Sequence, residues 1–228
     1  MKSLVFIFAR KGSKRIKNKN MKILNGKPLI EHTIDFIKKL KLIKSTVVST
    51  DDEKIIKYCK KNDIKNIIVR PKSLTGDNSN EFLSWKHAIK KIQDNRKKFE
   101  TFICLPLTSP LRLKKEFILA YKTFKKKKPD MIISICKTNH YPGFNIVKRK
   151  YKNKIKLIGN NNISNNYRKN IFNLTTSFYI ANKNFILRNK KIDFKKHNII
   201  GHEVSRKSGL DIDDKYDFEI AKLFLSKI

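Results

Sequence analysis

The residues with the clearest chemical potential lie just after the first apolar run of the chain. Leu4 to Phe8 has the pattern of a short strand, and the loop that follows combines small residues with cations. The loop residues of interest are Ala9, Arg10, Gly12, Ser13, Lys14, Lys19 and Asn20. Small residues let the backbone approach a ligand, and lysine and arginine neutralise phosphate charge. Because open α/β sheets bind ligands at the carboxyl ends of their strands, this loop is suited to a polyphosphate.

A second candidate site is a pair of aspartates near the end of the chain. Asp211 and Asp213 are two positions apart, so on an extended segment both carboxylates point to one side and can share a Mg²⁺ ion. The alternative is helix capping, because acidic side chains are favoured at the positive end of a helix dipole. We assign capping to Asp214 and Asp217, and metal binding to Asp211 and Asp213.

Other nucleotide and metal motifs are missing from the sequence. The pattern GxxxxGK[ST] is absent, since Gly26 and Lys27 are followed by Pro28, and GxGxxG is absent as well. The three cysteines are far apart, and the five histidines show no metal-ligand spacing. We therefore expect no zinc site, and we interpret the cysteines as small buried residues in a reducing compartment.

The charge balance is extreme, with 54 Lys and Arg against 19 Asp and Glu and a net charge of +35. Such a balance is typical of a nucleic-acid or membrane-surface partner. However, the lysines are scattered through every segment, and only Lys125 to Lys128 forms a block, so we favour a solvated surface. The first apolar run is too short for a signal peptide, and no run has membrane-spanning length. We expect a cytoplasmic protein with neither a nucleic-acid partner nor membrane insertion.

Short apolar runs alternate with longer amphipathic segments along most of the chain. The predicted strands are 4–8, 45–49, 67–69, 102–105 and 131–135, and the predicted helices are 29–40, 52–62, 80–92 and 115–126. A further strand at 176–181, another near Ile199 and a last helix at about 214–225 complete the pattern. This alternation predicts an α/β protein whose largely parallel sheet is covered on both faces. A length of 228 residues favours one main domain.

The alternation of predicted strands and helices stops between residues 137 and 170, where the chain is basic and rich in asparagine. At most a weak β-ribbon is expected here, around 144–158. The segment is either a floppy excursion or an arm that becomes ordered by packing on another subunit.

Five motifs resemble those of the acylneuraminate cytidylyltransferases, in the same order and at similar spacings. The first is the loop already described, with Gly26-Lys27-Pro28-Leu29 at the start of the first helix. The others are Ser49-Thr50-Asp51-Asp52, Arg70-Pro71 with Asp77, Thr108-Ser109-Pro110-Leu111-Arg112, and Asp211-Ile212-Asp213. Together they cover about residues 3 to 225.

The resemblance implies a three-layer Rossmann-like nucleotidyltransferase fold, as a single domain over residues 1–228. In this family a sugar hydroxyl attacks the α-phosphate of CTP and pyrophosphate leaves. The glycine, serine and cations of the first loop, with Ala9, Asn20 and Arg70, would bind the nucleotide. Arg10, Lys19 and Asp211 would be catalytic, and Asp211 and Asp213 would hold Mg²⁺. Asp51 and Asp52 are expected to cap the helix that follows them.

The same resemblance places a sugar site beside the nucleotide, formed by Thr108, Ser109, Arg112, Arg168, Thr175 and Tyr179. Arg112 has an alternative as a plain surface residue at a helix start. The chain departs from the family pattern at Leu105-Pro106-Leu107, where sialic acid enzymes usually carry a glutamine. It also reads Leu174-Thr175-Thr176 where many members carry asparagine and glycine. A legionaminic or pseudaminic type of sugar acid therefore suits the pocket at least as well as N-acetylneuraminate.

Two further functions stay open from the sequence. One is a nucleotidyltransferase of the same fold that acts on an eight-carbon keto acid or a sugar phosphate, and the other is a basic RNA-binding protein. The resemblance also implies a homodimer, with the arm at about residues 138–170 inserted across the interface.

Overall fold

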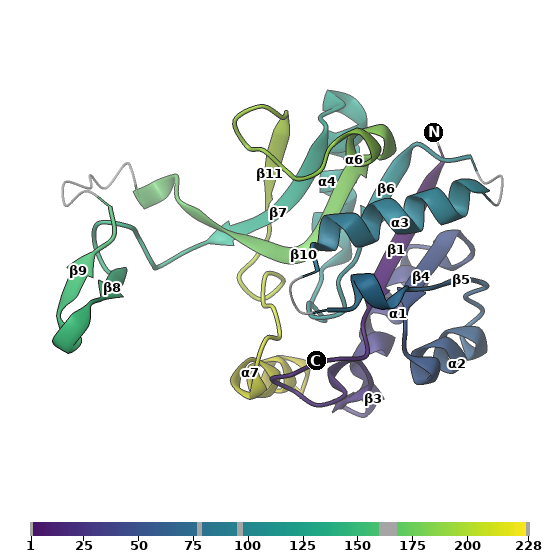
Figure 1. Cartoon of the computed structure of the whole chain (residues 1–228), viewed down its shortest axis with the longest axis horizontal. Coiled ribbons are helices and arrows are strands. Elements are labelled where there is room, and N and C mark those ends of the chain that lie inside the picture. The colour runs from purple at the N-terminus through teal and green to yellow at the C-terminus, as the bar shows by residue number, and fades with distance from the viewer. Residues whose placement is uncertain (1, 77–78, 95–97, 160–167, 227–228) are drawn as a thin grey trace.

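The computed structural model describes residues 2–76, 79–94, 98–159 and 168–226 (Figure 1). Its centre is a seven-stranded sheet with the order β11-β7-β10-β6-β1-β4-β5. The strands are β1 (Ser3–Ala9), β4 (Thr46–Thr50), β5 (Asn66–Val69), β6 (Thr101–Cys104), β7 (Met131–Lys137), β10 (Phe172–Asn182) and β11 (Ile199–Glu203). Only β10 runs against its neighbours β6 and β7, whereas the other pairs are parallel. The sheet is therefore mostly parallel, as the alternation of segments predicted.

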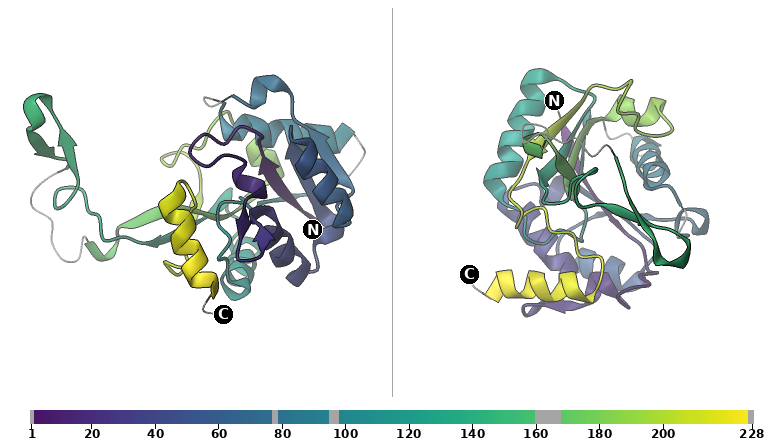
Figure 2. Two further views of the ribbon diagram at one scale, coloured as in Figure 1. Left: turned by 90° about the horizontal axis from the view of Figure 1, so that it is seen from below. Right: turned by 90° about the vertical axis from the view of Figure 1, so that its left-hand side faces the viewer.

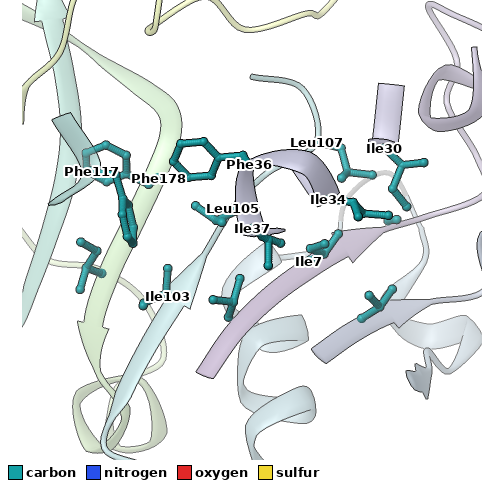
Figure 3. Packing of buried hydrophobic residues seen from close by; sticks show 14 of the residues in the cluster. Ile7, Ile30, Ile34, Phe36, Ile37, Ile103, Leu105, Leu107, Phe117 and Phe178 are labelled. Atoms are coloured by element: carbon teal, nitrogen blue, oxygen red, sulfur yellow. The ribbon is translucent and has the colours of Figure 1, made fainter. Parts of the chain in front are cut away.

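Helices cover both faces of this sheet. They are α1 (Leu29–Lys39), α2 (Glu53–Lys61), α3 (Glu81–Asp94), α4 (Lys114–Lys127), α6 (Lys183–Arg188) and α7 (Lys215–Ser226). Successive strand residues point to opposite faces, so Ile7 packs with α1 and α4 while Phe6 packs with α3 and α6. Figure 3 shows the first of these two cores, where Ile34 and Phe117 approach the sheet from different helices. The three-layer α/β fold is thus confirmed.

Shorter elements were not predicted. A small hairpin joins β2 (Ile23–Leu24) to β3 (Lys27–Pro28), and 3-10 turns lie at 19–21, 43–45, 72–74 and 151–153. The hairpin turn is Asn25-Gly26, and both residues have positive φ, as this two-residue turn requires. α7 packs against this hairpin through Phe218 and Leu24, so the last helix lies beside residues 23–28 (Figure 2).

The parallel direction of β1, β4, β5 and β6 decides where the motifs meet. Their carboxyl ends lie on one edge of the sheet, so the loops after Ala9, Thr50, Val69 and Cys104 are neighbours. The same edge receives the segment at 211–213, because Ile212 N donates a hydrogen bond of 2.8 Å to Thr108 O. The aspartate motif at 211–213 therefore lies at the same edge of the sheet as the other four sequence motifs.

The segment at 138–159 departs from the main body. It carries the antiparallel ribbon of β8 (Val147–Arg149) and β9 (Ile155–Leu157), which confirms the predicted ribbon. Figures 1 and 2 show this ribbon projecting away from the sheet. Residues 160–167 of the expected arm, and Asp77 of the Arg70-Pro71 motif, lie outside the described residues.

Within the part of the chain that the structure describes, no helix is both long enough and apolar enough to cross a membrane.

Candidate active site

A cavity of about 500 Å³ opens at the carboxyl edge of the sheet. It is lined by Phe8, Arg10, Ser13, Lys14, Arg15, Ile16, Lys19, Asn20, Glu81, Pro106, Leu107, Thr108, Thr176 and Asp213. Five of the predicted nucleotide residues are in this lining: Arg10, Ser13, Lys14, Lys19 and Asn20. Ala9 is buried at the end of β1, and Gly12 is exposed on the outside of the loop. The cations of the first loop therefore face one space together.

Three hydrogen bonds fix the shape of the loop after β1. Lys11 N donates to Asp51 Oδ1 at 2.8 Å, and Asn20 Nδ2 donates to Arg10 O at 3.2 Å. Arg10 also reaches across the site, where its guanidinium donates to Gly76 O at 3.2 Å. The loop is thus tied to its own end and to the loops after β4 and β5.

The two aspartates after β4 have different partners. Asp52 caps α2, because its Oδ1 accepts a hydrogen bond of 2.9 Å from Lys54 N. Asp51, which was predicted to cap the same helix, instead accepts from Lys11 N. The prediction is confirmed for Asp52 and is wrong for Asp51, because the approach of the first loop gives the Asp51 carboxylate a nearer donor.

Lys19 links the cation loop to the aspartate segment. Its Nζ donates a hydrogen bond of 2.6 Å to Ile212 O, the carbonyl between Asp211 and Asp213. Burial lowers the pKa of Lys19, although the two carboxylates oppose that effect. An amine that is partly stripped of water interacts more strongly with a negative ligand than an exposed lysine does.

Asp211 and Asp213 differ in their surroundings. Burial raises the pKa of Asp211, while hydrogen bonds from Thr108 and Thr176 and the charge of Lys19 oppose the shift. Its Oδ1 is buried with no hydrogen-bond partner among the described residues. Asp213 is exposed and pairs with Arg15 at 3.3 Å. An unpartnered carboxylate oxygen beside a second carboxylate is a donor set that a hard cation prefers.

The remaining acids of this segment cap α7. Asp217 Oδ2 accepts from Asp213 N and Asp214 N, and Asp214 Oδ1 accepts from Tyr216 N and Asp217 N, at 2.8 to 3.1 Å. The capping role predicted for Asp214 and Asp217 is therefore confirmed. No group of three or more histidine, cysteine, aspartate or glutamate side chains suited to a metal occurs among the described residues.

Arg70 lies in a second, smaller cavity of about 250 Å³ with Phe8, Arg10, Ser79, Glu81 and Ser84. Its guanidinium donates to Ser49 O at 3.1 Å and to Ser49 Oγ at 3.4 Å, and lies 5.6 Å from the centroid of the Phe8 ring. Burial lowers the pKa of Arg70, and the carboxylates of Asp51 and Glu81 oppose this shift.

Glu81 was missed by the sequence analysis. It lines both cavities, as do Phe8 and Arg10. In the sequence it reads only as an acid in the first turn of a helix, which is a common stabilising position. Its place at the site depends on how α3 packs over the sheet, and no short-range pattern reports that.

The predicted sugar residues are distributed over several places. Thr108 lines the main cavity, and Ser109 is buried next to it, with a hydrogen bond of 2.7 Å to the lining residue Thr176. Thr175 is buried on the opposite side of β10, where its hydroxyl donates to Ser134 Oγ at 2.8 Å. Tyr179 is half-buried against Trp85, with ring centroids 5.2 Å apart.

The two arginines of the predicted sugar set lie away from the main cavity's lining. Arg112 is buried, with 7% of its surface exposed, so the surface alternative is wrong. Its guanidinium donates to Ser177 O, Pro106 O and Thr33 Oγ1, and burial lowers its pKa to about 9. Arg168 lies at the base of the projecting segment, with its guanidinium 3.8 Å from the ring centroid of Phe144.

A family model described as cytidylyltransferase matches residues 4–203. The chain belongs to the cytidylyltransferase family. The cytidylyltransferase match spans all of the sheet and every site segment except the aspartates at 211–213. The protein is therefore a nucleotidyltransferase.

Three similar proteins show the range of its relatives, and two of them are named as cytidylyltransferases. The flagellin modification protein B of Campylobacter coli is 28% identical to this cytidylyltransferase, and the alignment covers 98% of this chain and 95% of that protein. A pseudaminic acid cytidylyltransferase of Campylobacter jejuni is 29% identical, with coverage of 98% and 96%. An N-acylneuraminate cytidylyltransferase of Streptococcus agalactiae is 28% identical over 96% of this chain, which spans about half of that longer protein (52%).

The fold of the cytidylyltransferase also occurs in solved structures. The structure of CMP:2-keto-3-deoxy-manno-octonic acid synthetase complexed with CTP aligns over 100% of this chain and 99% of that one. The TM-score is 0.71 and the sequence identity is 13%, so this likeness concerns the fold.

Proposed function

We propose that this protein transfers CMP from CTP to a nine-carbon 2-keto sugar acid and releases pyrophosphate. The observation that carries the proposal is the arrangement of charge around one cavity. Cations from the first loop line this cavity together with Asp213, and Lys19 is bonded to the carbonyl of Ile212 between the two aspartates. A triphosphate with its metal needs both kinds of group within one site.

The cations would bind the triphosphate and stabilise the reaction. Attack of the sugar hydroxyl on the α-phosphorus forms a new P–O bond and breaks the bond to the β-phosphate oxygen, so negative charge grows on the departing pyrophosphate. Arg10, Lys14 and Lys19 line the cavity where this charge would develop. Cations that are fixed before the reaction offset such charge without rearranging.

The aspartate segment fits a magnesium ion. Asp211 offers a buried oxygen that has no other described partner, and Asp213 offers an exposed carboxylate two residues away. Mg²⁺ at nucleotide sites commonly uses one or two carboxylates together with phosphate oxygens and water. When bound, the ion would neutralise phosphate charge, and Asp211 and Asp213 are the residues that would hold it.

The acceptor is proposed to be a sialic acid or a legionaminic or pseudaminic type of relative. Thr108 and Thr176 provide hydroxyl groups at the wall of the cavity, and Pro106 and Leu107 provide an apolar surface beside them. The activities named for the C. jejuni and S. agalactiae relatives support this class of acceptor. With this apolar surface where sialic acid enzymes usually carry a glutamine, a legionaminic or pseudaminic type of acid suits the cavity at least as well as N-acetylneuraminate, because sugar-specific hydrogen bonds are what separate close sugars.

A panel of acceptors tests this function. Pyrophosphate release from CTP and Mg²⁺ would be measured with N-acetylneuraminate, a legionaminic acid, a pseudaminic acid, the eight-carbon acid 2-keto-3-deoxyoctonate and a hexose phosphate. We expect release only with a nine-carbon acid. Release with only the eight-carbon acid or the hexose phosphate would identify the same-fold alternative. RNA binding that weakens steeply with salt, without any turnover, would favour the RNA-binding alternative.

We also propose that the protein is a homodimer joined through the projecting segment. This segment exposes large apolar side chains: Phe144 is 53%, Ile155 67% and Tyr151 84% exposed. A short isolated ribbon is marginally stable in water. Burial of these side chains against a second copy would stabilise the ribbon and the dimer together.

A further inference from the structure

The second cavity continues the first. Phe8, Arg10 and Glu81 line both spaces, so a ligand that extends along this wall passes from one into the other. The second space, of about 250 Å³, is half the volume of the first. This volume has room for one flat ring. The cation loop lies in the larger space, so the smaller space is where a base attached to those phosphates would lie.

The walls of the second cavity combine an aromatic ring with fixed polar groups. Phe8 is half-buried, and its ring lies 6.5 Å from that of Trp85. The Arg70 guanidinium is held beside it by two contacts to Ser49. A guanidinium offers only hydrogen-bond donors, so this wall suits a ring that carries acceptor atoms.

Glu81 supplies a hydrogen-bond acceptor to the same cavity. It is exposed to the cavity at the first position of α3, and an ionised carboxylate offers only acceptors. Desolvation by the surrounding protein raises the pKa of Glu81, and a hydrogen bond from Trp85 and the positive charge of Arg70 oppose that shift. An acceptor and a donor thus flank one small space, and both are held on regular elements or by hydrogen bonds.

We propose that Glu81 accepts a hydrogen bond from the exocyclic amino group of cytosine and thereby selects CTP over UTP. Cytosine presents an amino donor where uracil presents a carbonyl oxygen, and both carry acceptor oxygen at the other end. A carboxylate attracts the amino group and repels the carbonyl. This inference rests on the proposed function, because it takes CTP as the nucleotide that occupies the site.

The test measures equilibrium binding of CTP and of UTP, with Mg²⁺ and without any sugar acid. The wild-type protein should prefer CTP by on the order of 100-fold, because a site that offers a hydrogen-bond acceptor rejects a ligand that places another acceptor against it. In Glu81→Gln the amide can donate to uracil as well as accept from cytosine. We expect CTP to bind about tenfold more weakly and the preference to fall below about tenfold.

The matched control is Glu53→Gln, which removes the same charge from the first position of α2. It should leave the nucleotide preference unchanged. An unchanged preference in Glu81→Gln would overturn the inference, as would equal weakening of CTP and UTP in a variant whose thermal unfolding matches the wild type. If the variant unfolds early, Glu81→Asp provides the second test, since a shorter acid should weaken CTP binding selectively.

The binding measurement separates the inference from the proposed function. Preference for CTP that depends on Glu81, with no turnover of any nine-carbon acid, would support the inference and count against the proposed acceptor. A wild-type protein that binds neither nucleotide would overturn both.

Discussion

Lys19 donates a hydrogen bond of 2.6 Å from its Nζ to the backbone carbonyl of Ile212, 193 positions further along the chain. This contact joins the cation loop to the carbonyl that separates Asp211 from Asp213. Burial lowers the pKa of Lys19, and both aspartates favour its charged form. The groups proposed to hold phosphate and the groups proposed to hold metal are therefore one connected unit.

Replacement of Lys19 tests its place on the phosphates. Lys19→Ala should reduce kcat/KM for CTP by about 30- to 900-fold, which corresponds to about 2–4 kcal/mol of transition-state stabilisation. Steady-state pyrophosphate release measures the effect. Lys17→Ala is the matched control, since Lys17 is an exposed cation of the same loop outside the cavity lining. Equal and small effects of the two substitutions would remove Lys19 from the phosphate site.

Asp211→Asn should abolish turnover and leave the fold intact. Burial raises the pKa of Asp211 above the ordinary 3.8, so the folded state holds this proton more tightly than the unfolded state. That contribution to stability is present in full below pH 3.8 and is lost as pH rises through the raised pKa.

In the metal-free protein at neutral pH, the asparagine variant should thus unfold at the same or a higher temperature than the wild type. The difference should vanish in acid. Thermal unfolding at several pH values measures it. A variant that keeps the wild-type rate would show that Asp211 is dispensable for turnover. A variant that is less stable than the wild type at neutral pH, but not in acid, would contradict the raised pKa of Asp211.

Asp51 and Asp52 should have separable roles despite their adjacency. Asp51→Ala removes the acceptor for Lys11 N, so the loop loses an anchor and KM for CTP should rise about tenfold, equivalent to about 1.4 kcal/mol. Asp52→Ala removes the cap of α2 and should cost about 1 kcal/mol of stability, with KM unchanged. Kinetics and chemical denaturation of both variants check this. The reverse pattern would show that Asp51 supports the helix and not the loop.

Arg112 should act on stability more than on sugar binding. Arg112→Met keeps the stem but leaves two buried carbonyls, Ser177 O and Pro106 O, without their donor, at about 1–3 kcal/mol each. We expect a clear drop in the unfolding midpoint and a small change in KM for the acceptor. A large rise in acceptor KM at unchanged stability would instead place Arg112 on the sugar, as the family resemblance implies.

The projecting segment should control the oligomeric state. Tyr151→Asp with Ile155→Asp places two charges on its exposed apolar surface, and burial of unpaired charge opposes association. Sedimentation should show a dimer for the wild type and a monomer for the variant. Lys148→Gln with Lys156→Gln changes the net charge of the same ribbon by the same two units and controls for charge alone. A monomeric wild type, or a variant that remains a dimer, would contradict the proposed interface.

The order of helices and strands could be predicted from the sequence because it depends on local periodicity. The strand at 4–8 and the helix at 29–40 agree with β1 (Ser3–Ala9) and α1 (Leu29–Lys39). The direction of β10 could not be predicted, because an apolar strand has the same pattern whether it runs parallel or antiparallel. The hairpin at Asn25-Gly26 did carry a signal, namely the turn dipeptide, and that signal was overlooked.

The candidate site was predictable where its residues lie in one segment. Lys14 and Lys19 line the cavity, and Asp214 and Asp217 cap α7. Residues that reach the site only because distant elements pack together were harder to predict from the sequence. Glu81 reaches the cavity only through the packing of α3, and Arg112 is turned inward by carbonyls that lie 6 and 65 positions away.

The most direct test of the central claim is identification of both products by ³¹P NMR, with CTP, Mg²⁺ and the best nine-carbon acid from the panel. We expect one pyrophosphate for each CMP phosphodiester of the sugar acid, and neither product when the acid is omitted or when Asp211→Asn replaces the wild type. Pyrophosphate and free CMP without the acid, or no phosphodiester with any nine-carbon acid, would contradict it.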